Sequence, residues 1–187
     1  MKVKEIIMPT LVLVIITVVT SGLLVVTNSI TKEPIRQQQI AADNQSRQEV
    51  LPQADGFDDG QTIELDGTEY TYWTAQNGAG YVFSTQFKGY GGPVVVMTGI
   101  TTDGAVAGVK ITEQDETPGL GQKALDASFT DQYIKAIPEE EFVVTKQGAS
   151  ADNEIDAISG ATITSNAVTN SVNQAIQLYN TLTGGGD

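Results

Sequence analysis

The sequence predicts an α+β fold with an antiparallel or mixed sheet and packed helices, preceded by one N-terminal transmembrane helix. Three observations support this prediction. A long uncharged apolar segment opens the chain, β-rich runs separated by Asp-Gly pairs occupy its middle, and an amphipathic helical segment lies near its end. Hairpins that pack against helices are typical of the α+β class, whereas a parallel sheet requires helices that alternate with the strands.

The composition limits the chemistry that the chain can supply. Its 187 residues include no cysteine and no histidine, and its net charge is −13. The chain therefore has no disulfide, no Cys- or His-ligated metal centre, no thiolate nucleophile and no imidazole base. The acidic surplus argues against nucleic acid as a partner, because phosphate binding requires clustered lysine and arginine. Carboxylate, hydroxyl and backbone chemistry remain, together with chemistry that an organic cofactor supplies.

The first element is the segment 6–30, which contains no Asp, Glu, Lys or Arg over 25 residues. A helix of this length spans roughly 37 Å, enough to cross the roughly 30 Å hydrocarbon core of a bilayer. A cleaved signal peptide is the alternative, but its apolar region is shorter and ends in a small-x-small site, which residues 23–27 do not offer. We therefore expect residues 1–30 to form a retained membrane anchor.

The orientation of the anchor follows from charge. Basic residues flank it almost equally, with Lys2 and Lys4 before it and Lys32 and Arg36 after it, so the positive-inside rule gives no clear answer. After Lys32 the chain carries 7 basic and 22 acidic side chains, a net charge of −15 that suits the outer face. We expect a single-pass cell-membrane protein with a cytoplasmic N-terminus and an extracytoplasmic domain.

Residues 31–60 are rich in Gln, Asp, Asn and Arg, and we expect them to form a polar stalk before a domain at 61–187. A thin apolar stripe favours a helical stalk that ends before Pro52. The stripe consists of Ile35, Ile40, Val50 and Leu51. A flexible tether is the alternative that the composition leaves open.

Short strands form the first part of the domain. The pairs Asp66-Gly67 and Asp103-Gly104 each separate two β-rich runs and therefore predict β-hairpins. The expected strands are 62–65 with 69–75, 94–102 with 105–113, and two others at 81–87 and 142–146.

Two helices complete the predicted domain. Segment 125–137 has apolar residues at steps of four and stops at Pro138. The last helix is expected to begin near Ser165 and to end before Gly184, where three glycines follow one another. Its apolar face consists of Val168, Val172, Ala175, Tyr179 and Leu182.

The candidate site consists of three glycine-bearing loops at residues 88–93, 116–121 and 159–165. Taken singly, each loop is typical of a turn. The third loop is more specific, because it places hydroxyls and backbone N–H groups just before a helix, where the helix dipole favours a phosphate. The alternative is a simple N-cap by Thr164 or Ser165, and both interpretations can hold together.

Three runs of the sequence carry a family resemblance. The run Asp156-Ala157-Ile158-Ser159-Gly160-Ala161-Thr162 resembles the Asp-x-x-Ser-Gly-Ala-Thr signature of FMN-binding domains that receive FMN covalently, through a phosphoester to the threonine. With Glu116-Thr117-Pro118-Gly119-Leu120-Gly121, and with Gly89-Tyr90-Gly91-Gly92-Pro93 before a Val-rich run, the chain resembles the G subunits of Rnf-type complexes. The homologous C subunits of the sodium-pumping NADH:quinone reductases are the closest alternative.

The resemblance implies that Thr162 bears the FMN. A separate flavin transferase would move FMN from FAD onto this threonine and would read a sequence that includes Asp156. The other implied cofactor-binding residues are Ser159, Gly160, Ala161, Thr164 and Ser165 around the phosphate, and Glu116, Thr117, Gly119, Leu120 and Gly121 beside the isoalloxazine. No catalytic residue and no metal ligand is implied.

The resemblance also implies a function. The chain would be an electron-relay subunit with covalent FMN in a membrane-bound translocase, with no catalytic activity of its own. The complex would transfer electrons between ferredoxin and NAD and couple this flow to sodium or proton translocation. Its expected partners are the other subunits, the flavin transferase and membrane lipid. A non-redox, membrane-tethered assembly or binding module is the alternative from another class, and it predicts a polypeptide without FMN.

Other conspicuous residues receive structural interpretations. The aromatic residues Tyr70, Tyr72, Trp73 and Tyr81 could stack on a flavin, but at strand spacing they are more typical of a core. The acidic run 139–141 is expected to be solvated, and the aspartates at 55, 58 and 59 lack the rest of an EF-hand loop.

Overall fold

The computed structural model describes residues 3–184 and divides the chain into two compact units, Met1–Asn44 and Gln45–Asp187. Helix α1 (Val3–Val50) makes up the first unit and supplies the first residues of the second. Within the described residues, it is the one helix long and apolar enough to cross a membrane. The hydroxyls of Thr17 and Thr20 donate to the carbonyls of Leu13 and Ile16, each at 2.8 Å, so these polar groups are satisfied inside the helix.

The stalk is helical, as predicted, because α1 continues without a break to Val50 and ends two residues before Pro52. The compact unit begins at Gln45, inside the segment that composition assigns to the stalk. Val50 and Leu51 are almost completely buried, and they pack with Ala54 against the sheet of the domain. The last turn of α1 is therefore part of the folded domain.

Five strands form one antiparallel sheet in the order β1-β2-β3-β4-β5. Each strand pairs with the next one in the chain, so the sheet is a meander of hairpins. The predicted strands and both Asp-Gly turns are confirmed, and the turns place Asp66, Gly67 and Gly104 at positive φ. The strands are β1 (Gln61–Leu65), β2 (Thr68–Thr74), β3 (Gly80–Lys88), β4 (Pro93–Thr101) and β5 (Val106–Glu113).

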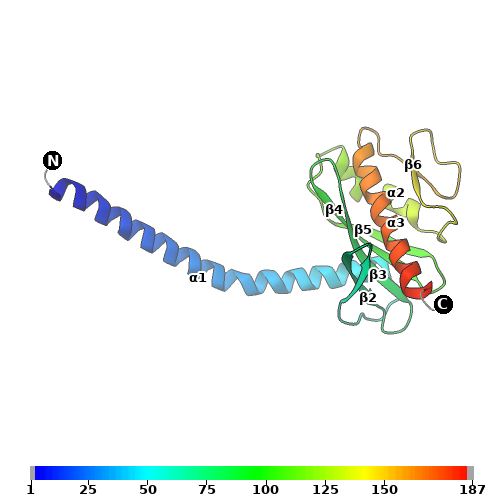
Figure 1. Ribbon diagram of the computed structural model, residues 1–187, viewed down its shortest axis with the longest axis horizontal. Helices are drawn as coiled ribbons and strands as arrows, with labels where there is room; N and C mark the ends of the chain where they lie inside the picture. Colours follow the sequence, from blue (N-terminus) through cyan, green and yellow to red (C-terminus); the bar gives the residue numbers. More distant parts are fainter. Residues whose placement is uncertain (1–2, 185–187) are drawn as a thin grey trace. The chain divides into compact units, whose positions relative to one another are not determined.

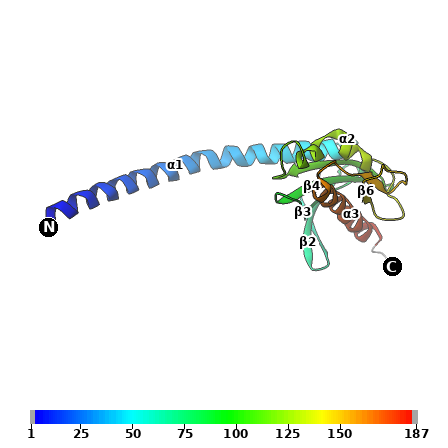
Figure 2. The ribbon, with the colours of Figure 1, turned by 90° about the horizontal axis from the view of Figure 1, so that it is seen from above.

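Helix α3 (Thr162–Gly184) crosses one face of this sheet and packs on β3 and β4 (Figures 1 and 2). Val94 and Val96 of β4 belong to the same buried apolar cluster as Val168 and Val172 of α3. The amphipathic pattern thus predicts the helix and its buried face correctly. The helix begins at Thr162, three residues before the predicted Ser165.

The opposite face of the sheet receives the end of α1 at a contact that we call the helix seat, made by Val50, Leu51, Ala54, Gly99 and Gly108. Gly99 of β4 and Gly108 of β5 are cross-strand partners. A Cβ atom on Gly99 would lie 2.2 Å from the carbonyl oxygen of Val50, and one on Gly108 would lie 2.7 Å from its Cα. Only glycine permits the backbones to approach so closely. Beside the seat, the Arg47 guanidinium lies 4.4 Å from the centre of the Trp73 ring.

The predicted helix at 125–137 is wrong. The structure has three short elements instead: the 3₁₀ helices η1 (Gly121–Leu125) and η2 (Asp131–Tyr133), with α2 (Ala127–Thr130) between them. Asp126 has an extended backbone with ψ 137°, which interrupts any continuous helix. Phe129 and Tyr133 nevertheless enter the core, where the Tyr133 hydroxyl forms a 2.7 Å hydrogen bond with the Thr169 hydroxyl. At Phe129 and Tyr133 the apolar spacing therefore reports burial rather than a helix, whereas Leu125 is exposed.

A second, two-stranded sheet pairs β6 (Val143–Thr145) with β7 (Glu154–Asp156) in parallel. The sequence predicts β6 but not β7. Ile155 in β7 is fully buried, and Ala157 donates its N–H to the Thr145 carbonyl just after the strand. The sheet therefore fixes the start of the signature run Asp156–Thr162.

Candidate functional site

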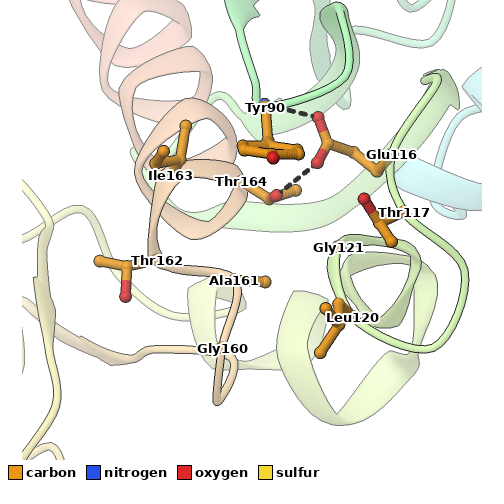
Figure 3. A pocket seen from close by; sticks show the side chains of 10 residues that line it. All are labelled: Tyr90, Glu116, Thr117, Leu120, Gly121, Gly160, Ala161, Thr162, Ile163 and Thr164. Carbon is orange, nitrogen blue, oxygen red and sulfur yellow. Dashed lines mark hydrogen bonds between the residues drawn. The ribbon is translucent and has the colours of Figure 1, made fainter.

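Three loops enclose a pocket of about 520 Å³ (Figure 3). They follow β3, follow β5 and precede α3, and each contains one of the glycine-bearing runs. This volume lies within the range of roughly 300–1,000 Å³ that is usual for small-molecule and cofactor sites. The lining residues are Tyr90, Glu116, Thr117, Leu120, Gly121, Gly160, Ala161, Thr162, Ile163 and Thr164.

The signature run forms a tight turn between β7 and α3. The N–H of Ala161 donates to the carbonyl of Ile158 at 2.9 Å and closes a four-residue β-turn. Gly160 occupies the third position of this turn with φ 78°, which is favourable for glycine. The Ser165 hydroxyl accepts the N–H of Ile158 and donates to the carbonyl of Ala161, each at 3.0 Å. These bonds hold the turn against the first residues of α3.

The first turn of α3 borders the pocket. The first intrahelical hydrogen bond runs from Ser165 N–H to Ala161, so the N–H groups of Thr162, Ile163 and Thr164 have no acceptor within the helix. Unpaired N–H groups and the positive end of a 23-residue helix favour an anion at this position.

The four hydroxyls of this loop differ in their availability. Those of Thr164 and Ser165 are buried and hydrogen-bonded. Those of Ser159 and Thr162 make no hydrogen bond with any residue that the structure describes. Of these two, only Thr162 lines the pocket, where its side chain is half-buried. Thr162 therefore presents the one free hydroxyl of this loop to the pocket.

The loop after β5 contributes a buried carboxylate. A 3.2 Å hydrogen bond from Leu120 N–H to the Thr117 carbonyl closes the Thr-Pro-Gly-Leu turn, in which Gly119 has φ 76°. Glu116, just before this turn, is only 3% exposed. The Thr164 hydroxyl donates to its Oε2 at 2.6 Å, and the N–H groups of Tyr90 and Gly91 donate to its Oε1 at 2.8 and 3.1 Å (Figure 3).

The loop after β3 supplies an aromatic side chain. A 2.7 Å hydrogen bond from Gly89 N–H to the Gly92 carbonyl closes the loop. Tyr90 at its tip is 71% exposed, and Figure 3 shows its ring between Ile163 and Glu116. Tyr90, Leu120 and Ile163 are all well exposed, so they give the pocket an apolar rim.

The structure brings eight of the eleven predicted cofactor residues to the pocket and leaves three outside its lining. Ser159 is exposed in the turn, Gly119 forms the turn after Glu116, and Ser165 holds the signature turn from within the core. The eight lining residues are Glu116, Thr117, Leu120, Gly121, Gly160, Ala161, Thr162 and Thr164.

Sequence reasoning missed Tyr90 and Ile163. Tyr90 lies in a glycine loop that the sequence does single out, but nothing in the sequence shows that its ring faces the other two loops. Ile163 is an exposed apolar residue at the start of a helix. Its position between two threonines of the signature loop is the sequence feature that could have indicated a contact with a ligand. The four strand aromatics pack instead in two apolar clusters of the domain, as predicted.

The segment before the signature is held by carboxylates. Asp156 accepts the N–H of Ala149 at 2.6 Å. Hydrogen bonds from the backbone N–H and the hydroxyl of Ser150, and from Ala151 N–H, lower the pKa of the Glu154 carboxyl below its ordinary value. In the part of the chain that the structure describes, no group of three or more Asp and Glu residues could hold a metal ion.

Comparison with known proteins places these features in a family. Residues 1–50 match the model of the RnfG N-terminal region, and residues 89–177 match the FMN-binding domain. The G subunit of the Na⁺-translocating ferredoxin:NAD⁺ oxidoreductase complex of Acetobacterium woodii is 38% identical over 191 residues, with 92% of this chain and 90% of that protein covered. The chain belongs to the RnfG family.

A second relative is similar over nearly the same share of the chain. The G subunit of the proton-translocating ferredoxin:NAD⁺ oxidoreductase complex of Clostridium ljungdahlii is 33% identical, covering 91% of this chain and 90% of that protein. The resemblance to RnfG proteins and to FMN-binding domains that the motifs indicate is confirmed. The apolar α1 helix and the membership in the RnfG family together support association with a membrane.

Two solved structures share the fold of the RnfG chain. The C subunit of the Na⁺-translocating NADH-quinone reductase from Parabacteroides distasonis has a TM-score of 0.57 at 22% identity, covering 76% of this chain and 94% of its own. NqrC of Shewanella oneidensis has a TM-score of 0.51 at 18% identity, covering 74% of this chain and 70% of its own. These likenesses confirm the predicted fold class, while the relatives of higher identity are RnfG proteins.

Proposed function

We propose that this chain is the electron-relay subunit of a membrane-bound Rnf-type complex and that Thr162 carries its FMN covalently. The relatives are subunits of ferredoxin:NAD⁺ oxidoreductase complexes that translocate sodium ions or protons. Bound FMN supplies reversible one- and two-electron transfer. The chain itself supplies a site for the flavin and no histidine or cysteine. It is thus a redox subunit of a translocase whose partners are the other subunits of that complex.

The observation that carries the proposal is the free Thr162 hydroxyl at the first turn of α3. A phosphate esterified to this hydroxyl would lie next to the unpaired N–H groups of the helix start. The nearby hydroxyls of Thr164 and Ser165 are engaged in buried hydrogen bonds and are therefore poor competitors for the same attachment.

A flavin transferase would form the bond with FAD as the co-substrate. The Thr162 oxygen would form a new P–O bond to the FMN phosphorus while the pyrophosphate bond of FAD breaks, so that AMP would leave and the hydroxyl proton would be released. The RnfG chain needs no base of its own, because the transferase activates the reaction. Asp156 belongs to the sequence that this enzyme reads.

The apolar rim would receive the isoalloxazine. Tyr90, Leu120 and Ile163 are exposed apolar side chains on the same pocket as Thr162. Contact with a flat aromatic cofactor would remove their surface from water, and the Tyr90 ring could stack on it.

Intact mass and in-gel fluorescence test the attachment. We expect the full chain, co-expressed with a flavin transferase, to gain the mass of one FMN phosphoester and to fluoresce on a denaturing gel. Thr162→Ala should abolish both signals. Thr181→Ala is the matched control, because it removes an exposed threonine hydroxyl of the same helix that lies outside the signature run and outside the pocket lining. Flavin that survives Thr162→Ala, or a bare wild-type polypeptide, overturns the proposal.

We also propose that α1 stays in the lipid bilayer with the N-terminus in the cytoplasm and the FMN domain outside. The absence of cysteine makes this easy to test. A single Asn180→Cys substitution on the exposed side of α3 provides one thiol. We expect a membrane-impermeant maleimide to label it in cells whose outer envelope is permeabilised and whose cell membrane is intact. Labelling only after disruption of the cell membrane overturns this orientation.

A further inference from the structure

Glu116 is unusual among the charged residues of the domain. Within residues 7–184, for which the structure describes exposure, it is the only buried carboxylate. A buried charge is costly unless donors surround it, and an isolated one lowers the stability of the fold. Its position beside the pocket therefore requires an explanation.

The donors come from both of the other loops. Tyr90 and Gly91 N–H groups bind Oε1, and the Thr164 hydroxyl binds Oε2. Hydrogen bonds to an ionised acceptor are shorter and stronger than neutral ones, which matches the 2.6 Å contact from Thr164. One carboxylate thus joins the loop after β3, the loop after β5 and the start of α3.

Glycines allow the loops to close on this carboxylate. A Cβ on Gly89 would lie 2.2 Å from Glu116 Oε1, and a Cβ on Gly121 would lie 2.5 Å from Oε2. A Cβ on Gly91 would lie 1.9 Å from the carbonyl oxygen of Asp115. Gly89 and Gly91 of the loop after β3 and Gly121 of the loop after β5 are therefore explained by the same feature, the close approach of backbone to Glu116 and its neighbour Asp115.

The carboxylate lies away from the attachment threonine. Figure 3 shows Thr162 on one side of the pocket and Glu116 on the other, next to Tyr90 and Thr117. Its charge is therefore directed at what occupies the Tyr90 side of the pocket rather than at a phosphate on Thr162.

We propose that Glu116 is the positioning residue of this pocket and that its negative charge makes the bound flavin harder to reduce. This inference rests on the proposed function. Electrons added to the flavin increase its negative charge, and a fixed carboxylate in a partly desolvated site opposes that increase more strongly than one in water. The same carboxylate holds the three loops at the spacing that the pocket needs.

The charge is tested on the full chain loaded with flavin. Glu116→Gln keeps an oxygen that can accept from Tyr90 and Gly91 and removes the charge. We expect its flavin midpoint potential, measured by dye equilibration, to shift to a more positive value than that of the wild type. Asp115→Asn is the matched control, because it removes the neighbouring but exposed charge, and its shift should be smaller. An unchanged potential in Glu116→Gln, or an equal shift in Asp115→Asn, overturns the electrostatic role.

The positioning role is tested without flavin. In the full chain expressed without transferase, we expect Thr164→Val to lower the thermal unfolding midpoint of the domain and Thr164→Ser, which keeps the hydroxyl, to restore it. In the presence of transferase, Thr164→Val should also reduce the flavin content. If Thr164→Val has neither effect, the positioning role is overturned. A wild-type chain that takes up no flavin instead overturns the proposed function, while the thermal measurement still tests the loops.

Discussion

The helix seat and the pocket both depend on glycines that let backbone approach a neighbour, but with opposite results. At the helix seat, Gly99 and Gly108 admit the Val50 backbone and close an apolar contact. In the pocket, Gly89 and Gly121 admit the Glu116 carboxylate, and a cavity of about 520 Å³ stays open beside it. At the helix seat, the Val50 backbone packs directly on the two glycines and leaves no space between the end of α1 and the sheet. The Glu116 carboxylate, shared by several loops, holds the backbone of Tyr90 and Gly91 and the first turn of α3 together beside an open cavity.

The difference separates what each region does for the protein. The helix seat buries Val50 and Leu51 almost completely and so contributes mainly to stability. The pocket exposes Tyr90, Leu120 and Ile163 and so leaves apolar surface for a ligand. Variants at the seat should therefore affect unfolding, and variants in the pocket should affect the flavin.

The largest effect is expected when the seat loses its helix. A fragment that begins at residue 45 should unfold cooperatively in urea, and one that begins at 61 should not. The shorter fragment lacks Val50 and Leu51, whose burial contributes about 3–6 kcal/mol of a total of about 5–15 kcal/mol. Circular dichroism during the titration measures this. A cooperative transition of equal midpoint in the 61–187 fragment would contradict the role of the seat.

The next largest effect is expected from Gly99→Ala. Its Cβ would meet the Val50 carbonyl, which belongs to rigid backbone, so we expect the free energy of unfolding to fall by about 1–3 kcal/mol. Flavin content per folded molecule should not change, because the pocket is built from other loops. Gly184→Ala is the control, since nothing lies within 4 Å of an added Cβ there. Equal urea midpoints for the two variants would show that the close approach at Gly99 does not contribute to stability.

Gly91→Ala should show the reverse pattern. The added Cβ would collide with the Asp115 carbonyl and displace the loop that donates to Glu116. We expect a several-fold loss of flavin content by absorbance and mass, with a stability cost near 1 kcal/mol, which is ordinary for a single substitution. Gly92→Ala has its nearest contact at 3.7 Å and serves as the control. If Gly91→Ala lowered the free energy of unfolding more than Gly99→Ala does, the proposed difference between the pocket and the helix seat would be contradicted.

The smallest effect concerns an ion pair beside the seat. Lys110 hydrogen-bonds Glu49 and lowers the pKa of that carboxyl, with Gln45 contributing. The pKa of Glu49 is lower in the folded chain than in the unfolded chain, where it is about 4.3. The ion pair therefore stabilises the fold at pH values above about 4.3, and this stabilisation is lost as the pH falls through the folded-state pKa of Glu49. Lys110→Met should therefore cost less than about 1 kcal/mol at pH 7, and this difference should vanish in acid. Urea titrations at both pH values measure it, with Lys146→Met as the exposed control. A difference that persists in strong acid would exclude the ion pair as its cause.

The parts of the fold that local chemistry decides could be predicted from the sequence. Asp66-Gly67 and Asp103-Gly104 specify their hairpins through turn geometry alone. The parts that depend on distant contacts could not. β7 has only three residues, too few for an alternating pattern, and it exists because Ile155 is buried and Val143 and Thr145 lie alongside. Segment 125–137 carries helical spacing, but its contacts with the core hold it in shorter turns.

The residues of the candidate site also differ in how far the sequence could predict them. The signature run and the glycine loops could be found because their residue types are contiguous in the sequence. The convergence of Tyr90 and Thr164 on Glu116 spans separations of 26 and 48 residues. No periodicity records contacts of that range, so neither the shared carboxylate nor the tyrosine at the rim could be derived without the fold.

The signature turn has a consequence for the order of maturation. Strand β7 fixes one end of the run Asp156–Thr162, helix α3 fixes the other, and Ser165 bonds to both sides of the turn between them. An enzyme that modifies Thr162 in the folded domain must therefore accept a compact corner and cannot draw the segment out as an extended peptide. The enzyme would then recognise the shape of this turn as well as its sequence, so the domain would have to fold before the flavin is attached.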